Sequence, residues 1–446
     1  MERRELVIVG GSAGGTQAAI CAQKHHGMKD IMVIRQEEKV MVPCGIPYIY
    51  GTLGTVEMNI MPDKFLGEAE LKVGKVVSID RDAKTVALKD GEAIGYNRLI
   101  LATGSNPVML PIPGIDKKNV FFVRKDTDYL RKLSDAVEKA RHILVIGGGF
   151  IGVEFADECR KRGCEVTLVE VLEHCLQLVC IEEFCIRVED VLKERGVNIV
   201  TGDAVTSIGG SDRVEFVEMG NGKRIECDVV IIGIGTVPNT KLAKDAGLEI
   251  GPTKGIKVDE FQRTTDSEIF AVGDCAEKYS FFDHQPVPVR LASVATREAK
   301  IAIANLYTAK WRNVGSIGVF STVVGDTAVA MAGLGDTCAA RMGYDIVIGK
   351  AEAMTKHPGT MPDTKPMKLR LIFDRQSGKL LGGCACCIRG VGEIANLVAA
   401  CIVNGMTIEQ IAIFPMGTHP WLTASPLSYQ LTEAASDAMH KVIFRK

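Results

Sequence analysis

A single cysteine between two prolines is the residue of this chain best placed to do chemistry. Cys44 lies in the heptapeptide Val-Pro-Cys-Gly-Ile-Pro-Tyr, residues 42–48. The prolines and the adjacent glycine predict a rigid turn with exposed backbone, which is a poor place to bury a thiol. Cysteine reacts as its thiolate, and a nearby helix N-terminus lowers the pKa of the thiol. We therefore expect Cys44 to be a reactive thiol; the alternative is a buried apolar one.

Two glycine loops indicate dinucleotide binding. Residues 10–15 (Gly-Gly-Ser-Ala-Gly-Gly) and 147–152 (Gly-Gly-Gly-Phe-Ile-Gly) each follow an apolar run and open a helical pattern. This order predicts a buried parallel strand that feeds a helix, whose N-terminal N–H groups favour a pyrophosphate. After the second loop, Glu170 ends the next strand, where a carboxylate accepts hydrogen bonds from ribose hydroxyls and repels a 2′-phosphate. NADH is therefore expected in preference to NADPH. The alternative to dinucleotide binding at the second loop is a glycine-rich turn without a ligand.

The first loop departs from the pattern. Ser12 occupies the place of the middle glycine, and Arg35 stands where an acidic residue should end the following strand. Glu37 or Glu38 is the candidate to replace that acid.

The repeat of strand, loop and helix organises the first two thirds of the chain. It predicts an α/β fold with two doubly wound dinucleotide-binding domains. The first domain is expected to be discontinuous (residues 1–114 and 252–314), with the second inserted at 115–251. Residues 315–446 form a separate α+β domain, with strands expected at 345–349 and 368–373 and helices at 391–405 and 407–413.

Bulk properties exclude several classes of function. The net charge of −2 gives no basic field for nucleic acid or an anionic membrane. No apolar run reaches the length of a membrane span, and the N-terminus lacks a signal-peptide pattern, so a cytoplasmic location is expected. Fourteen cysteines in such a chain do not indicate a disulfide framework, and no metal site is expected.

Five ordered motifs together resemble the flavin-dependent pyridine nucleotide–disulfide oxidoreductases. They are residues 10–15, 102–104 (Ala-Thr-Gly), 147–152, 233–239 (Gly-Ile-Gly-Thr-Val-Pro-Asn) and 273–274 (Gly-Asp). The resemblance implies that the first domain binds FAD, the second binds NAD(P)H and the third forms a homodimer or a dimer of dimers. It implies FAD contacts at Gly10, Ser12, Ala13, Gly14, Gly15, Glu37, Pro43, Thr103, Gly104, Gly273 and Asp274, the last on the ribityl chain. It implies NAD contacts at Gly147, Gly149, Phe150, Ile151, Gly152, Glu154, Glu170 and Gly235.

The sulfur pattern selects a branch of this family. Dithiol reductases carry two cysteines five residues apart, whereas Lys39 and Ile49 stand at those distances from Cys44. The chain therefore resembles the single-cysteine branch, which holds coenzyme A-disulfide reductases, persulfide or polysulfide reductases, and NADH oxidases and peroxidases. The oxidases and peroxidases carry a histidine in the first loop where this chain has Ala13. Alanine cannot donate a proton to an oxygen species, which favours sulfur chemistry.

The C-terminal domain departs from the coenzyme A-disulfide reductase pattern. Residues 356–362 lack the tyrosine of those enzymes, and residues 414–420 are closer to the His-Pro of dithiol reductases. His419 is thus a candidate general acid that protonates a leaving thiolate. The alternative is an interface histidine with a structural role.

The expected activity passes a hydride from NADH through FAD to Cys44, which reduces a small disulfide, persulfide or polysulfide; coenzyme A is a further candidate ligand. One alternative is an NADH oxidase that makes water or peroxide, and another is an NADH-responsive sensor or electron carrier for a protein partner.

Most of the other cysteines are expected to pack in the core. Cys175, Cys180 and Cys185 recur every five residues in a stretch with a helical pattern, and steps of five cannot share one helix face. Cys384, Cys386 and Cys387 are expected on a strand at the dimer interface; the alternative is an accessory thiol relay.

Overall fold

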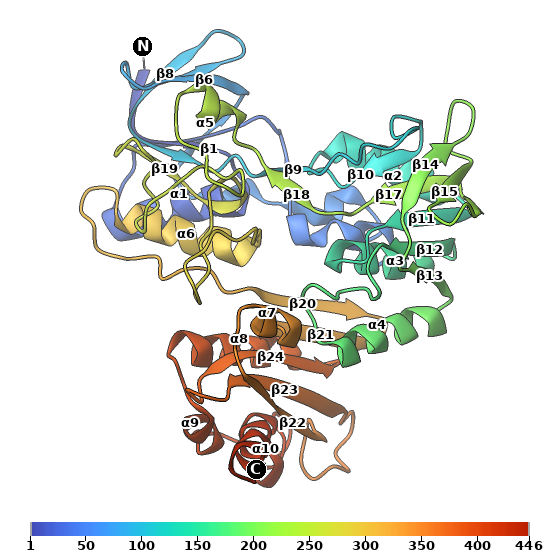
Figure 1. The fold of residues 1–446 in the computed structure, drawn as a ribbon. Helices are drawn as coiled ribbons and strands as arrows, with labels where there is room; N and C mark the ends of the chain where they lie inside the picture. The colour runs from blue at the N-terminus through green and yellow to red at the C-terminus, as the bar shows by residue number, and fades with distance from the viewer. Residues whose placement is uncertain (1, 445–446) are drawn as a thin grey trace. The chain divides into compact units, whose positions relative to one another are not determined.

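The first glycine loop joins strand β1 (Glu2–Val9) of a mixed sheet to a helix in the first of two structural units. The computed structural model describes residues 2–444 (Figure 1). The first unit comprises Met1–Pro111, Asn119–Ala140 and Ile234–Ser316, and the second comprises Ile112–Lys118, Arg141–Gly233 and Ile317–Lys446.

A mixed sheet forms the centre of the first unit. Its order is β5 (Glu70–Val73), β2 (Ile31–Arg35), β1 (Glu2–Val9), β8 (Ala93–Leu101), β7 (Thr85–Leu88) and β6 (Val76–Asp80), with β19 (Ile269–Ala271) also paired to β8. The pairs β1–β2, β1–β8, β2–β5 and β8–β19 are parallel, whereas β6 and β7 add an antiparallel edge. All five residues of β2 are buried, as a continuous apolar run predicts for a strand covered on both faces.

Helices and loops cover both faces of this sheet. On one face α1 (Ala13–His26) packs against α6 (Ala292–Ala304), and both contribute to an apolar cluster with Leu6 and Ile8 of β1. On the other face Val7 and Leu99 pack with Ala243 of α5 (Lys241–Asp245). The first unit is therefore doubly wound.

Short elements connect or follow the sheet strands of the first unit, and some of them carry candidate site residues. These elements are β3 (Val40–Met41), η1 (Pro43–Gly45), η2 (Pro47–Tyr50), η3 (Val56–Asn59), β4 (Ile60–Met61), η4 (Asp63–Leu66), β9 (Ser105–Pro107), β10 (Val120–Phe122), α2 (Thr127–Lys139), β18 (Thr236–Pro238) and η5 (Gly273–Cys275). β3 pairs with β4 and β9 pairs with β18, both antiparallel.

The second unit repeats the parallel arrangement. Its parallel strands follow the order β17 (Val229–Ile232), β11 (His142–Ile146), β12 (Glu165–Glu170) and β13 (Val197–Thr201). Helices α3 (Phe150–Lys161) and α4 (Glu182–Glu194) pack on these strands. A small antiparallel sheet of β14 (Val205–Gly209), β15 (Phe216–Met219) and β16 (Arg224–Glu226) follows.

The C-terminal part of the second unit is an antiparallel sheet with helices. Its order is β20 (Val319–Val324), β21 (Thr327–Gly333), β24 (Leu380–Cys387), β23 (Pro366–Asp374) and β22 (Ile346–Met354). The helices are α7 (Asp336–Arg341), α8 (Val391–Val403), α9 (Ile408–Ala412) and α10 (Gln430–Phe444), with a short η6 (Pro426–Ser428). Helix α10 lies directly on β22, because a Cβ on Gly349 would fall 1.9 Å from the carbonyl oxygen of Ala434.

The predicted α/β fold with a C-terminal α+β part is confirmed. One local prediction is wrong: Cys175 and Cys180 lie in turns, and only Cys185 lies in a helix, α4. The apparent helical pattern fails because the chain must first turn back over the second glycine loop, where Leu176 N–H donates to the carbonyl of Gly148 (2.9 Å). Among the described helices, none combines the length and apolarity needed to cross a bilayer.

Candidate thiol and nucleotide sites

Cys44 is exposed on a short 3-10 turn of the first unit. The turn η1 follows β3, and the N–H of Gly45 donates to the carbonyl of Val42 at 3.0 Å. Pro43 starts this turn and Pro47 starts the next one, as expected for residues with a fixed φ and no N–H to satisfy. The predicted exposed turn is therefore present.

Asn59 braces the turn that carries Cys44. Asn59 is only 4% exposed, and its side-chain Nδ2 donates to the Val42 carbonyl at 3.0 Å. In return, the backbone N–H of Val42 donates to the Asn59 carbonyl at 2.9 Å. A Cβ on Gly45 would lie 2.0 Å from Asn59 Oδ1, so a larger residue at position 45 would displace the Asn59 side chain. Sequence reasoning missed Asn59, because it is 15 residues away and only the β3–β4 pairing brings it to Cys44.

The first glycine loop turns tightly from β1 into α1. Gly10 has a φ of 114°, and a Cβ on it would fall 2.1 Å from the Ala102 carbonyl oxygen. A Cβ on Gly15 would fall 1.8 Å from the Gly10 carbonyl oxygen. Ser12 is the N-cap of α1 but makes no side-chain capping bond, and the first turn, which starts at Ala13, holds no acidic residue. The helix therefore presents N–H groups without a competing carboxylate, which suits an anion.

Arg35 takes a structural role at the end of β2. It is 3% exposed, and its guanidinium donates to Asp63 Oδ1 (2.7 Å) and to the carbonyls of Glu37 (2.8 Å) and Glu38 (2.6 Å). A Cβ on Gly11 of the first loop would fall 2.8 Å from the Arg35 Cδ, so the two residues are in close contact. Arg35 therefore holds the 37–38 segment beside the loop, and Glu37 is the half-buried acid of that segment.

Asp274 lies on η5, directly after β19. Its Oδ2 accepts from Ser105 Oγ at 2.8 Å, and Lys125 Nζ lies 3.7 Å away. Gly273 has a φ of 74°, a conformation that favours glycine. The turn is thus fixed on one side by the segment that follows β8.

The motif after β8 is tied to the 233–239 motif. Thr103 Oγ1 donates to the Asn239 carbonyl (2.7 Å), and Asn239 N–H donates to the Gly104 carbonyl (2.9 Å). Gly235, with a φ of 94°, accepts from the Val108 N–H at 3.0 Å. Each of the two motifs therefore holds the backbone of the other in place.

The second glycine loop is the more regular one. A Cβ on Gly152 would fall 1.7 Å from the Gly147 carbonyl oxygen, whereas a Cβ on Gly149 would meet open space among the described residues. Glu170 accepts from the N–H groups of Gly148 (2.6 Å) and Leu172 (2.8 Å), one on each carboxylate oxygen. Each oxygen keeps a second lone pair for a ribose hydroxyl.

Two residues of α3 contact the C-terminal sheet. Phe150 stacks on Phe320 of β20 with ring centroids 5.2 Å apart, and Thr322 Oγ1 donates to Glu154 Oε1 at 2.9 Å. The side chain of Ile151 lies close to Gly233, because a Cβ on that glycine would fall 3.3 Å from it. Phe320 and Thr322 were missed from the sequence, because nothing in a strand pattern shows which helix its side chains reach.

His419 is exposed in the segment between α9 and η6. Its Nδ1 accepts from Trp421 N–H at 3.3 Å, so the neutral imidazole carries its proton on Nε2. Its own N–H donates to Thr423 Oγ1 at 3.0 Å. Cys44, the first loop and Asp274 belong to the first unit, whereas the second loop, Glu170 and His419 belong to the second.

The family model described as pyridine nucleotide-disulphide oxidoreductase matches residues 4–299, and the model of its dimerisation domain matches residues 319–428. The chain belongs to this family of oxidoreductases.

Relatives in the family are named for more than one activity. The chain is 29% identical over 98% of its length to an NADH oxidase of Methanocaldococcus jannaschii, 99% of which is covered. It is 30% identical over 85% of its length to a CoA-dependent NAD(P)H sulfur oxidoreductase of Pyrococcus abyssi, 86% of which is covered. The solved NAD-dependent persulfide reductase of A. fulgidus matches 98% of this chain with a TM-score of 0.91 and 29% identity, and 83% of that chain is covered.

The loops of this oxidoreductase fit dinucleotides in shape and in charge. Both loops start helices that have no acidic residue in the first turn, and both use glycine where a side chain would block the turn. Two such cradles in one chain, with an exposed thiol in the first unit, can serve transfer of electrons between a nucleotide and sulfur.

Proposed function

We propose that this oxidoreductase is an FAD-dependent NADH:disulfide or persulfide reductase whose substrate sulfur reacts at Cys44. The observation that carries the proposal is the exposed Cys44 on a turn braced by Asn59, in the same unit as the first glycine loop and Asp274. When bound, NADH supplies a hydride and FAD passes its two electrons on to sulfur.

The chemistry assigned to the protein is thiol–disulfide exchange. The Cys44 thiolate attacks one sulfur of a disulfide, forms a Cys44–substrate disulfide and releases the other half as a thiolate. Two electrons and a proton then release the second thiol and restore Cys44. With a persulfide or polysulfide, the sulfur transferred to Cys44 leaves as hydrosulfide after the same two-electron reduction.

His419 is the proposed donor of the proton to the leaving thiolate. The donor is the protonated ring, which would give up the proton on Nε2, the nitrogen that does not contact Trp421 N–H. The assignment depends on a homodimer. Exposed apolar side chains near His419 support a protein interface there: Trp421 is 53%, Leu422 78% and Leu427 89% exposed.

The proposed nucleotide roles are those that the resemblance to the family implies. Gly10–Gly15, Glu37, Pro43, Thr103, Gly104 and Asp274 are assigned to FAD, and Gly147–Gly152, Glu154, Glu170 and Gly235 to NADH. Glu170 favours NADH over NADPH, because its carboxylate repels a 2′-phosphate. Coenzyme A is a proposed substrate component, in line with the name of the CoA-dependent Pyrococcus abyssi relative.

The test separates sulfur from oxygen as the acceptor. Protein reduced with NADH without oxygen is mixed with coenzyme A disulfide, with polysulfide or with oxygen, and flavin absorbance is followed. We expect fast reoxidation by a sulfur compound, loss of that reaction in Cys44→Ser, and its retention in Cys338→Ser, which changes the other exposed cysteine. Reoxidation by oxygen alone would contradict the proposal and favour an NADH oxidase, the activity for which the Methanocaldococcus jannaschii relative is named.

A further inference from the structure

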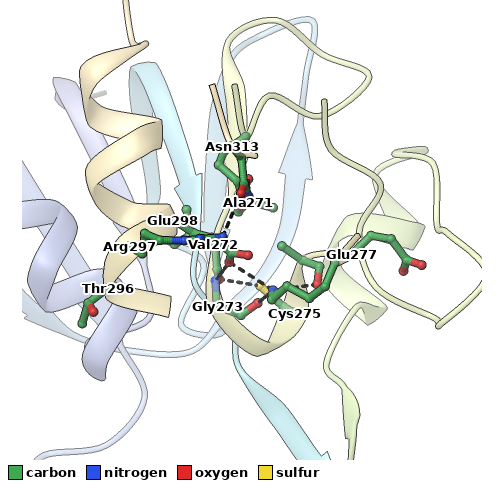
Figure 2. A network of polar contacts seen from close by, with 12 residues as sticks. Ala271, Val272, Gly273, Cys275, Glu277, Thr296, Arg297, Glu298 and Asn313 are labelled. Atoms are coloured by element: carbon green, nitrogen blue, oxygen red, sulfur yellow. Dashed lines mark hydrogen bonds and ion pairs between the residues drawn. The ribbon is translucent and has the colours of Figure 1, made fainter. Parts of the chain in front are cut away.

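A buried ion pair lies behind the turn that carries Asp274. Lys278 is 4% exposed and Glu298 of α6 is fully buried, with 3.0 Å between Nζ and Oε2. Figure 2 shows the polar contacts of Glu298 and its neighbours around Gly273 and Cys275. The pair belongs to none of the motifs that identify the family.

Both charges bind the backbone of the turn. The N–H of Gly273 donates to Glu298 Oε2 at 2.8 Å, and Lys278 Nζ donates to the carbonyls of Gly273 and of Ala276, the latter at 2.9 Å. The peptide groups on both sides of Gly273 are therefore held by charged groups. Charge-assisted hydrogen bonds of this kind fix geometry more firmly than neutral ones.

Stability alone does not explain this pair. Apolar residues of similar volume often stabilise a core as well as a buried ion pair does, because two charges must be desolvated. Glu298 also leaves its Oε1 without a hydrogen-bond partner among the described residues. Arg297, its neighbour in α6, donates instead to Asn313 Oδ1 (2.8 Å) and to the Gly315 carbonyl (2.6 Å). Burial raises the pKa of the Glu298 carboxyl, which the Lys278 ammonium and the Gly273 N–H oppose.

We propose that Lys278 and Glu298 are positioning residues, which hold the Gly273–Cys275 turn so that Asp274 can bind the flavin. The inference rests on the proposed function, in which Asp274 contacts the ribityl chain. Asp274 is then fixed from two sides: Ser105 Oγ donates to its carboxylate, and the ion pair holds the backbone immediately before it.

The test measures FAD binding to the apoprotein and the visible spectrum of the bound flavin. We expect Lys278→Met and Glu298→Gln each to raise the Kd for FAD about tenfold or more, with a shifted flavin spectrum. Binding of NADH to the apoprotein should stay unchanged. A double variant, Lys278→Met with Glu298→Leu, removes both charges and leaves neither one buried alone, so it should fold while FAD binding stays weak.

Glu277→Gln is the matched control. Glu277 is adjacent to Lys278 and 1% exposed, but its carboxylate accepts from Thr253 and Gly255 and is directed away from Glu298 (Figure 2). Its FAD affinity should equal that of the wild type. Wild-type FAD affinity in the double variant would overturn the inference, as would an equal loss in Glu277→Gln. Wild-type protein that binds no FAD would instead overturn the proposed function itself.

Discussion

The side-chain amide of Asn59 lies 3.0 Å from the carbonyl oxygen of Val42, two residues before Cys44. A second bond joins the same two residues through their backbones, at 2.9 Å. The position of the exposed thiol is therefore set by a buried side chain from the end of η3, rather than by the prolines alone.

Replacing Asn59 should affect both stability and turnover. In Asn59→Ala the Val42 carbonyl loses its buried side-chain donor, so the free energy of unfolding should fall by about 1–3 kcal/mol. A looser turn should also lower kcat with the sulfur substrate by roughly tenfold. Chemical denaturation and steady-state kinetics measure the two effects. Asn305→Ala is the control: Asn305 is also 4% exposed and donates to the carbonyls of Ile301 and Trp311. It should lose stability but keep kcat; an equal loss of kcat there would argue against a specific role for Asn59.

Alkylation should separate the cysteines by exposure. Of the described cysteines, Cys44 and Cys338 are exposed and the others are buried. Burial raises the pKa of the Cys386 thiol to about 11 and that of Cys227 to about 12, which keeps both protonated at neutral pH. Brief treatment with iodoacetamide, followed by peptide mass spectrometry, should label Cys44 and Cys338 first. Activity should fall in step with labelling of Cys44 in the Cys338→Ser variant; full activity after complete labelling of Cys44 would contradict its role.

Glu170 should control the choice of coenzyme. In Glu170→Gln the ribose loses a charged acceptor and a 2′-phosphate meets no carboxylate. We expect the KM for NADH to rise about tenfold and the KM for NADPH to fall. Glu165→Gln, at the exposed start of the same strand, should leave both KM values unchanged. An unaltered ratio of NADH to NADPH efficiency in Glu170→Gln would remove Glu170 from the coenzyme site.

The pair of Glu183 and Arg370 should make the second unit sensitive to acid. Arg370 donates to both carboxylate oxygens of Glu183, at 2.9 and 2.8 Å. Burial raises the pKa of the Glu183 carboxyl, but Arg370 and Lys368 lower it by more, so the net pKa is below its ordinary value. The folded state then binds this proton more weakly than the unfolded state does.

The stabilisation from Glu183 is therefore complete above the unfolded-state pKa of about 4.3 and is lost as the pH falls through the folded-state pKa. Thermal unfolding between about pH 6 and about pH 3.5 should show a larger decrease in Tm for the wild type than for Glu183→Gln. Glu226→Gln, at an exposed position of β16, should behave like the wild type. Parallel Tm curves for the wild type and Glu183→Gln would contradict the expectation.

The parts of the site that depend on local sequence could be predicted. The glycine loops, the exposed turn at Cys44 and the position of Glu170 follow from spacing, because glycine and proline restrict the backbone wherever they occur. The contacts that come from distant segments could not be predicted. Asn59 reaches Cys44 through a two-residue strand pair, and Glu298 reaches Gly273 from α6, 25 residues away.

Arg35 shows that a departure from a binding motif at one position does not reveal the role of the residue found there. Its place suggested a ribose-binding acid replaced by a cation, yet the guanidinium is occupied by Asp63 and two backbone carbonyls. The wrong helix through Cys175 has a related cause, since periodicity alone cannot show that a segment must fold back over the Gly148 loop.

The stack of Phe150 on Phe320 joins the start of α3, the helix after the second glycine loop, to β20 of the C-terminal sheet. A protein shortened to end before β20 would expose that ring to water and deprive Glu154 of the Thr322 hydroxyl. The dimerisation domain therefore shares packing and a hydrogen bond with the helix that follows the second glycine loop, so its removal should also destabilise that helix.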